Sequence, residues 1–126
     1  MPTNEPMPKL VDVSGLAAAL EAFARERDWE QFHSPKNLVM ALTGEVGELA
    51  EVFQWLTEEQ SRQVPHDAEL IARAREELAD VLFYLTRLAT VLGIDIDDAA
   101  RSKLAINAAK YPADRSRGSS RKYTGI

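Results

Sequence analysis

The chain has 126 residues, 45% of them hydrophobic, and a formal net charge of −5 at pH 7. This length suits one compact domain, and the acidic balance argues against nucleic acid as the main partner. No apolar run approaches the ~18 residues of a membrane span, and no secretory signal peptide is recognisable. The absence of cysteine excludes disulfides and fits a reducing compartment, so we expect a cytoplasmic protein without a membrane partner.

The two ends of the chain differ from its middle in composition. Residues 1–12 are polar and rich in proline, and we predict a disordered leader there. Residues 13–111 are predicted to form the helical domain. Residues 1–111 carry 11 Lys/Arg and 19 Asp/Glu, whereas residues 112–126 carry 4 Lys/Arg and one Asp. The last segment is therefore a basic tail, which either contacts an anionic ligand or extends into solvent.

Sequence signals place the first two helices. Apolar residues recur at helical spacing from about Ser14 to Arg27, which predicts the first helix. A connection rich in aromatic residues follows at 28–33. Ser34 followed by proline is typical of an N-cap and the first helical position, and the second helix is predicted to run from there to about Leu56.

The second half of the domain is predicted to hold a polar loop and two more helices. The loop covers residues 57–65, and the third helix covers about residues 67–92, where Gly93 ends it. Asp95 is the predicted N-cap of the fourth helix, which reaches about Lys110. No segment alternates as a strand would. Four helices with short connections predict an all-α fold, a four-helix bundle.

Two of the predicted helices each carry a pair of acids three residues apart. Glu45 and Glu48 lie on the second helix, and Glu77 and Asp80 lie on the third. At about 100° per residue, Glu45 and Glu77 fall inside the apolar stripes of their helices, and the second acid of each pair falls at the edge of its stripe. If these helices pack antiparallel, four carboxylates converge.

Four uncompensated carboxylates inside a bundle are unfavourable, because a buried ionised group needs a proton or a cation. Oxygen ligands without His or Cys favour Mg²⁺ or Mn²⁺ over zinc. We therefore predict a magnesium site, in which Mn²⁺ can substitute, at four ligands: Glu45, Glu48, Glu77 and Asp80.

Two alternatives to the magnesium site stay open at this point. The acids could lie on solvated faces and pair with Lys or Arg. They could also form a di-iron site, although such sites need a histidine three residues after a glutamate, and neither His33 nor His66 stands in that position.

Further side chains are candidates for contacts with a substrate. On the fourth helix, Lys103 and Asn107 share one sector, where they would meet a phosphate chain or reach from the core edge to water. The aromatic residues Trp29, Trp55 and Tyr84 suit stacking on a base, or they are ordinary core residues.

The acidic pairs stand within longer runs that resemble a known superfamily. E-x-x-E, followed about 28 residues later by E-x-x-D, is similar to the metal motif of the all-α nucleotide pyrophosphatases, which include MazG and the dimeric dUTPases. Four runs resemble the dCTP pyrophosphatase branch: FARERDWEQFHSPKNLVMALTGEVGELAEVFQW, EELADVLFYL, SKLAINAAKYP and SSRKYT. The resemblance covers roughly residues 20–124.

This resemblance implies a reaction and a set of site residues. Members cleave the bond between the α- and β-phosphates of a (deoxy)nucleoside triphosphate, typically dCTP or 5-modified dCTP in this branch, which cleans the nucleotide pool. By the motif match the four acids would hold Mg²⁺, and Lys103 and Asn107 would contact phosphates. The base and sugar would lie against Trp29, Gln31, His33, Trp55 and Tyr84. Members are homodimers or homotetramers with the pocket completed near the subunit interface.

One departure concerns the first helix, where some relatives have a histidine near the base and this chain has Leu20. The base preference is therefore left open.

The predicted reaction is metal-assisted hydrolysis. Glu48 is the predicted general base, because its side chain at the edge of the apolar stripe can reach both the metal and solvent. The chain has no P-loop signature, which argues against a P-loop ATPase. Two other functions stay open: hydrolysis of dUTP or other triphosphates by the same fold, and a non-catalytic helical module that binds a basic partner.

Overall fold

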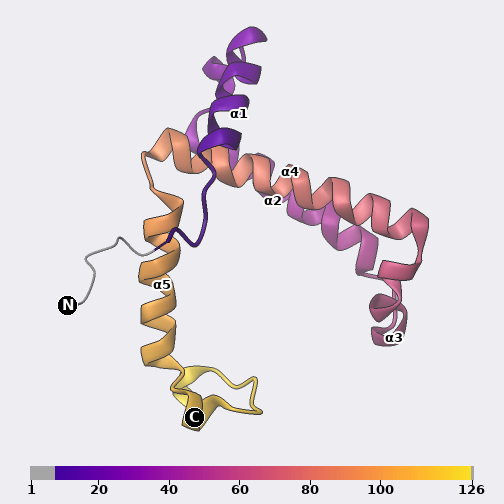
Figure 1. Ribbon diagram of the computed structural model, residues 1–126. Coiled ribbons are helices and arrows are strands. Elements are labelled where there is room, and N and C mark those ends of the chain that lie inside the picture. Colours follow the sequence, from indigo (N-terminus) through magenta and orange to yellow (C-terminus); the bar gives the residue numbers. More distant parts are fainter. Residues whose placement is uncertain (1–7, 126) are drawn as a thin grey trace, which may run out of the picture. The chain divides into compact units, whose positions relative to one another are not determined.

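Every regular element between residues 8 and 125, the part of the chain that the computed structural model describes, is an α-helix or a short 3-10 turn (Figure 1). The predicted all-α fold class is therefore confirmed. The described residues divide into two compact units. We call residues 13–94 the central unit, and residues 8–12 with 95–125 the terminal unit.

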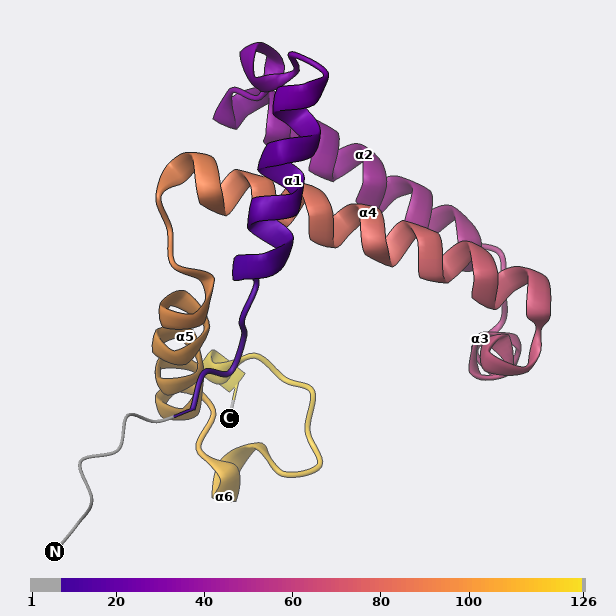
Figure 2. The same cartoon turned by 45° about the horizontal axis from the view of Figure 1, so that its top comes forward.

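The central unit contains three long helices and three short helical turns. In chain order they are α1 (Ser14–Glu26), η1 (Glu30–Phe32), α2 (Pro35–Phe53), α3 (Glu58–Arg62), η2 (Val64–His66) and α4 (Ala68–Leu92). Helices α2 and α4 pack along each other in opposite directions, and α1 packs against α4 (Figures 1 and 2). The antiparallel arrangement that brings the two acidic pairs together is therefore present.

The ends of the long helices follow the sequence signals closely. Ser34 caps α2 by accepting a hydrogen bond from the backbone N–H of Asn37 at 3.2 Å. Gly93 ends α4 at φ 69°, in the left-handed region that glycine adopts without strain. These predicted boundaries are confirmed, whereas α2 ends at Phe53 rather than at Leu56.

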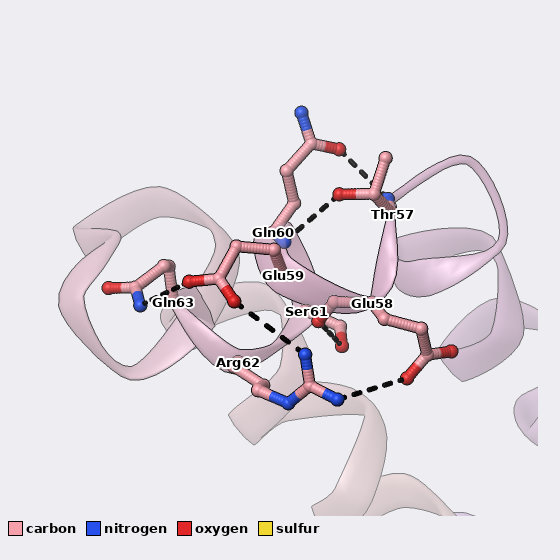
Figure 3. Close-up of polar contacts among 7 residues, drawn as sticks. All are labelled: Thr57, Glu58, Glu59, Gln60, Ser61, Arg62 and Gln63. Atoms are coloured by element: carbon pink, nitrogen blue, oxygen red, sulfur yellow. Dashed lines mark hydrogen bonds and ion pairs between the residues drawn. The ribbon is translucent and has the colours of Figure 1, made fainter.

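The polar loop predicted before α4 is wrong, because this segment forms α3 and η2 (Figure 3). Thr57 Oγ1 accepts a hydrogen bond from the backbone N–H of Gln60 at 3.1 Å, and Gln60 Oε1 accepts one from the N–H of Thr57 at 2.9 Å. This capping box is joined by ion pairs from Arg62 to Glu58 and Glu59 at 4.0 and 3.6 Å. A polar helix of about one turn has no apolar stripe, so hydrophobic periodicity does not reveal it.

The core of the central unit is small. Its buried apolar side chains come from the three long helices and η2: Ala24, Leu38, Val52, Val64, Ala74 and Ala89. Several larger apolar side chains of α2 and α4 are exposed instead: Val39, Met40, Val46, Ile71, Leu78, Leu82 and Leu85. Burial of apolar area is the main favourable term in folding and association, so this surface is available for packing against another chain.

The terminal unit is built on α5 (Ile96–Lys110), which is followed by α6 (Ala113–Ser116) and the 3-10 turn η3 (Tyr123–Gly125). Asp95 caps α5 as predicted, by accepting a hydrogen bond from the backbone N–H of Asp98 at 3.0 Å.

The start and the end of the chain both contact α5. The carboxylate of Asp97 accepts hydrogen bonds from the N–H groups of Leu10 and Val11 at 2.6 and 3.0 Å. These two hydrogen bonds, first that of Val11, hold the pKa of Asp97 below its usual value. The ammonium group of Lys110 lies 5.0 Å from the centre of the Tyr123 ring.

Residues 1–7 of the predicted leader lie outside the described residues, so the division into leader, domain and tail stays a prediction. No helix of the described residues is long and apolar enough to cross a membrane.

Candidate metal and nucleotide site

Three of the four predicted metal ligands meet between α2 and α4. Glu45, Glu48 and Glu77 each offer one carboxylate oxygen, and these oxygens all lie within 4.8 Å of one another. Glu45 and Glu77 are partly buried, whereas Glu48 is exposed. On α2 this gradient agrees with the helical positions, which place Glu45 in the apolar stripe and Glu48 at its edge, whereas Asp80 on α4 is partly buried like Glu77.

The buried oxygens of this carboxylate cluster have no protein partner. Glu45 Oε2 and Glu77 Oε2 are both shielded from solvent, and neither has a hydrogen-bond partner. None of the ion pairs among residues 8–125 involves an acid of the cluster. Among the described residues, these acids therefore do not form the ion pairs with Lys or Arg that the first alternative requires.

Desolvation and mutual repulsion raise the pKa values of the cluster. The pKa of Glu45 rises from 4.5 to about 7, first through desolvation and then through the hydrogen bond and charge of Glu48 and the charges of Asp80 and Glu77. The pKa of Glu77 is raised as well, again first by desolvation and then by Glu48. Contacts between carboxyl groups are hydrogen bonds only while one group holds a proton. Without a cation, the cluster therefore retains a proton up to neutral pH.

A divalent cation fits this donor set. It would satisfy the two unpartnered oxygens and offset the charges that raise the pKa values. Glu45, Glu48 and Glu77 thus form a cluster that could hold a metal ion. Asp80 contributes charge to the cluster and lines the cavity next to it, but it is not among the three acids that converge most closely.

A cavity of about 270 Å³ lies beside Asp80 in the central unit. Its walls come from α1, the connection around η1, and α4: Leu20, Phe23, Ala24, Trp29, His33, Asp80, Phe83, Tyr84 and Arg87. The rings of Phe23 and Trp29 pack edge to face with their centres 5.7 Å apart. The cavity therefore has an aromatic wall at one side and, at another, Asp80, the acid next to the carboxylate cluster.

A polar pair crosses the cavity wall. Arg87 Nε donates a hydrogen bond to His33 Nδ1 at 3.1 Å. Desolvation and then the charge of Arg87 lower the pKa of His33, whereas Glu30 raises it. The imidazole of His33 is therefore neutral near pH 7, and its proton is on Nε2 because Nδ1 accepts the bond from Arg87.

Most of the predicted base and sugar contacts lie at this cavity, and some do not. Trp29, His33 and Tyr84 line it. Gln31 does not line it, and its amide donates instead to the carbonyl and carboxylate oxygens of Asp28 at 2.9 and 3.1 Å. Trp55 follows α2 with 85% of its surface exposed and is not part of the cavity.

The two predicted phosphate contacts belong to the other unit. Lys103 and Asn107 are exposed on α5, in the terminal unit. The sequence predictions also missed four cavity residues: Phe23, Ala24, Phe83 and Arg87. Helical spacing could have found Arg87, because it stands three residues after Tyr84 and seven after Asp80, on the same face of the helix.

The chain also matches known proteins in sequence. The sequence model of the MazG-like family matches residues 41–126. The chain belongs to the MazG-like family. It is similar to the dCTP pyrophosphatase 1 of Homo sapiens, with 50% identity over 121 residues that cover 96% of this chain and 69% of that protein.

Two further relatives show how far the likeness extends. A dATP/dGTP diphosphohydrolase of Cyanophage S-2L is 46% identical over 61 residues, which cover 45% of this chain and 58% of that protein. The crystal structure of a pyrophosphatase from Archaeoglobus fulgidus has a TM-score of 0.74 and 33% identity, and the match covers 86% of this chain and 99% of that one. The sequence of this MazG-like chain thus resembles a dCTP pyrophosphatase, and its fold resembles that of a pyrophosphatase.

Proposed function

We propose that this MazG-like protein is a metal-dependent nucleotide pyrophosphatase that hydrolyses dCTP, or a modified dCTP, to the monophosphate and pyrophosphate. The observation that carries the proposal is the convergence of Glu45, Glu48 and Glu77 beside an aromatic cavity in the same unit. The likeness to dCTP pyrophosphatase 1 over 96% of the chain supports the substrate. The role that follows is removal of unwanted nucleotides from the pool.

Magnesium is the proposed metal, and Mn²⁺ is expected to substitute for it. The ligands would be Glu45, Glu48, Glu77 and Asp80, which offer only carboxylate oxygens. Hard divalent cations prefer such ligands, and Mg²⁺ commonly bridges carboxylates to substrate phosphates. Mg²⁺ bound here would offset phosphate charge and make a nearby water more acidic.

Glu48 is the proposed general base. It is the exposed member of the cluster, so it can reach a water that approaches from solvent and return the proton to bulk. Glu45 and Glu77 are more buried and are better placed to bind the cation than to exchange protons with solvent. Lys103 and Asn107 are kept as proposed phosphate contacts, and their support is the match of their segment to the dCTP pyrophosphatase branch.

The cavity is the proposed base and sugar pocket. Trp29 and Phe23 supply aromatic surface, Tyr84 lies one helical turn beyond Asp80, and His33 presents a neutral imidazole. Gln31 is retained in the proposal only through its place in the matching segment, since its amide is bonded to Asp28.

A homodimer or homotetramer is the proposed assembly. Ile71, Leu78 and Leu85 recur every seven residues on α4, so they form one line along the helix, and each is at least 40% exposed. A contiguous exposed apolar stripe is typical of a protein interface. Trp55, exposed at the end of α2, is the residue that a neighbouring subunit's pocket could receive. A cytoplasmic location is part of the same proposal and is supported by the absence of cysteine.

A second substrate class has one observation in its favour. The phage relative acts on dATP and dGTP, as its name states, so sequence similarity to this relative does not by itself determine which base the pocket prefers. The same fold acting on other deoxynucleoside triphosphates, including dUTP, is therefore the alternative that the assay must separate.

The direct test is a panel of (deoxy)nucleoside triphosphates incubated with and without Mg²⁺. We expect monophosphate and pyrophosphate, with dCTP giving the highest kcat/KM, and no turnover in EDTA. The Glu48→Gln variant should lose turnover, and Glu51→Gln, an exposed acid on the same helix, should retain it. Orthophosphate as the first product, or equal turnover in EDTA, would contradict the proposal.

A further inference from the structure

Arg87 is a buried cation in the wall of the proposed base pocket. Only 9% of its surface is exposed, although it stands near the end of α4. Arginine is rarely buried to this extent unless its charge is paired, because removing a charge from water is costly.

No acidic partner explains the burial. Among residues 8–125, no ion pair involves Arg87, and its one hydrogen bond is the bond from Nε to His33 Nδ1. A guanidinium group has five N–H donors in a fixed fork. Four of these donors, on Nη1 and Nη2, therefore have no acceptor among the described residues, and the side chain that carries them lines the cavity.

The hydrogen bond to His33 holds the guanidinium group of Arg87 at its Nε atom. The lowered pKa of His33 keeps its imidazole neutral, so Nδ1 stays an acceptor for Nε near pH 7. A guanidinium held at Nε keeps its plane and presents the terminal nitrogens as a pair. The arrangement is thus preorganised for a ligand with two adjacent acceptors.

The place of Arg87 along α4 decides which part of a nucleotide it meets. Asp80, beside the metal cluster, comes first, then Tyr84 one turn later, and Arg87 seven residues after Asp80. Seven residues advance about 10 Å along a helix. With phosphates at the carboxylates, the sugar would lie near Tyr84 and the base near Arg87, at the aromatic wall of Phe23 and Trp29.

We propose that Arg87 is a specificity-determining residue that donates two parallel hydrogen bonds to O2 and N3 of a cytosine base. Uracil and thymine carry a hydrogen on N3, so they place a donor against a donor. This inference rests on the proposed function, since it assumes that the phosphates bind at the carboxylate cluster. The same donor pair fits O6 and N7 of guanine, so a comparison of cytosine with uracil, at constant ring size, isolates the acceptor pattern.

The test measures binding rather than turnover, with dCMP and dUMP titrated by calorimetry into the full chain with Mg²⁺ present, because a cation lets the carboxylate cluster accept a phosphate. Wild-type protein should bind dCMP about tenfold or more tightly than dUMP, the size of effect expected for a paired arginine contact. Arg87→Met should bring the two dissociation constants within about twofold. Arg87→Lys keeps the charge but lacks the fork, so most of the preference should be lost as well. Arg62→Met removes an exposed arginine on α3 and should keep the wild-type preference.

Two results would overturn the role of Arg87. The first is equal binding of dCMP and dUMP by the wild type. The second is an unchanged preference in Arg87→Met, which indicates a structural role if both nucleotides bind more weakly. If Arg87→Met does not fold, as judged by circular dichroism, Arg87→Lys decides alone. If the wild type prefers dCMP but releases no pyrophosphate from dCTP, the proposed function is refuted and the role of Arg87 is not. If it releases pyrophosphate but shows no preference for dCMP over dUMP, the role of Arg87 is refuted and the proposed function is not.

Discussion

Removing one charge from the carboxylate cluster should stabilise the protein that has no metal. In Glu45→Gln, a neutral amide of almost the same shape replaces the carboxyl whose pKa rises from 4.5 to about 7. A raised carboxyl pKa means that the stability it supports is fully present below pH 4.5 and is lost as the pH rises through 7. The wild type should therefore weaken over this range, and Glu45→Gln should weaken less, because only the raised pKa of Glu77 remains.

The pKa rise sets the size of the effect. A rise from 4.5 to about 7 corresponds to at most about 3.5 kcal/mol, at about 1.4 kcal/mol per unit. The cluster is partly open to solvent, and screening reduces this upper bound, so we expect about 1–2 kcal/mol. For a domain of this size, that is an increase in Tm of about 4–8 °C. The gain should appear at pH 8 and be absent at pH 4.

The assay is thermal melting followed by circular dichroism, in EDTA at pH 4 and pH 8 and then at pH 8 with Mg²⁺. Mg²⁺ at a hundred times its Kd should stabilise the wild type by about 2.7 kcal/mol and so raise its Tm. The Tm of Glu45→Gln should stay nearly unchanged when Mg²⁺ is added. Glu51→Gln, on the same helix but exposed, is the matched control and should show neither effect. A lower Tm for Glu45→Gln than for the wild type at pH 8 in EDTA would refute the electrostatic reasoning.

Three further predictions concern side chains outside the cluster. Trp55→Ala should raise KM severalfold with little change in Tm, because this indole is 85% exposed; steady-state kinetics and melting test it, and an unchanged KM would remove Trp55 from the pocket. Leu78→Asp, in the apolar stripe of α4, should reduce the assembly to a smaller species in light scattering, and an unchanged mass would place the interface elsewhere. Gly93→Ala should cost about 1 kcal/mol in urea unfolding: a Cβ there meets nothing within 4 Å, so only the left-handed φ of 69° opposes it. An unchanged unfolding midpoint would show that α4 ends without that conformation.

The long helices and the convergence of the carboxylates were predictable because each leaves a local signal. Ser34 and Gly93 mark helix ends through their own backbone preferences, independently of the rest of the fold. Glu45 and Glu77 stand out because a charge inside an apolar stripe is costly unless something compensates it. These signals need only helical geometry, and the structure agrees with them.

The parts that sequence reasoning missed depend on tertiary contacts or on very short elements. The one-turn α3 shows no periodicity, and only Thr57 with Gln60 marks it. Arg87 shares a helical face with Asp80 and Tyr84, but its burial follows only from the cover that α1 and the η1 connection provide. Trp55 was predicted as a contact of the base, but α2 ends at Phe53 and the indole after it is 85% exposed and outside the cavity.

The two faces of α4 separate chemistry from assembly in a way that experiments can exploit. Leu78 and Asp80 are two residues apart, so they point about 200° apart around the helix, and the exposed stripe lies opposite the cavity wall. A charge at Leu78 should therefore disturb assembly without touching the carboxylates or Arg87. If Trp55 serves the pocket of a neighbouring subunit, Leu78→Asp should reproduce the KM of Trp55→Ala while keeping the response of Tm to Mg²⁺. A dissociated Leu78→Asp protein with wild-type KM would instead show that each chain completes its own pocket.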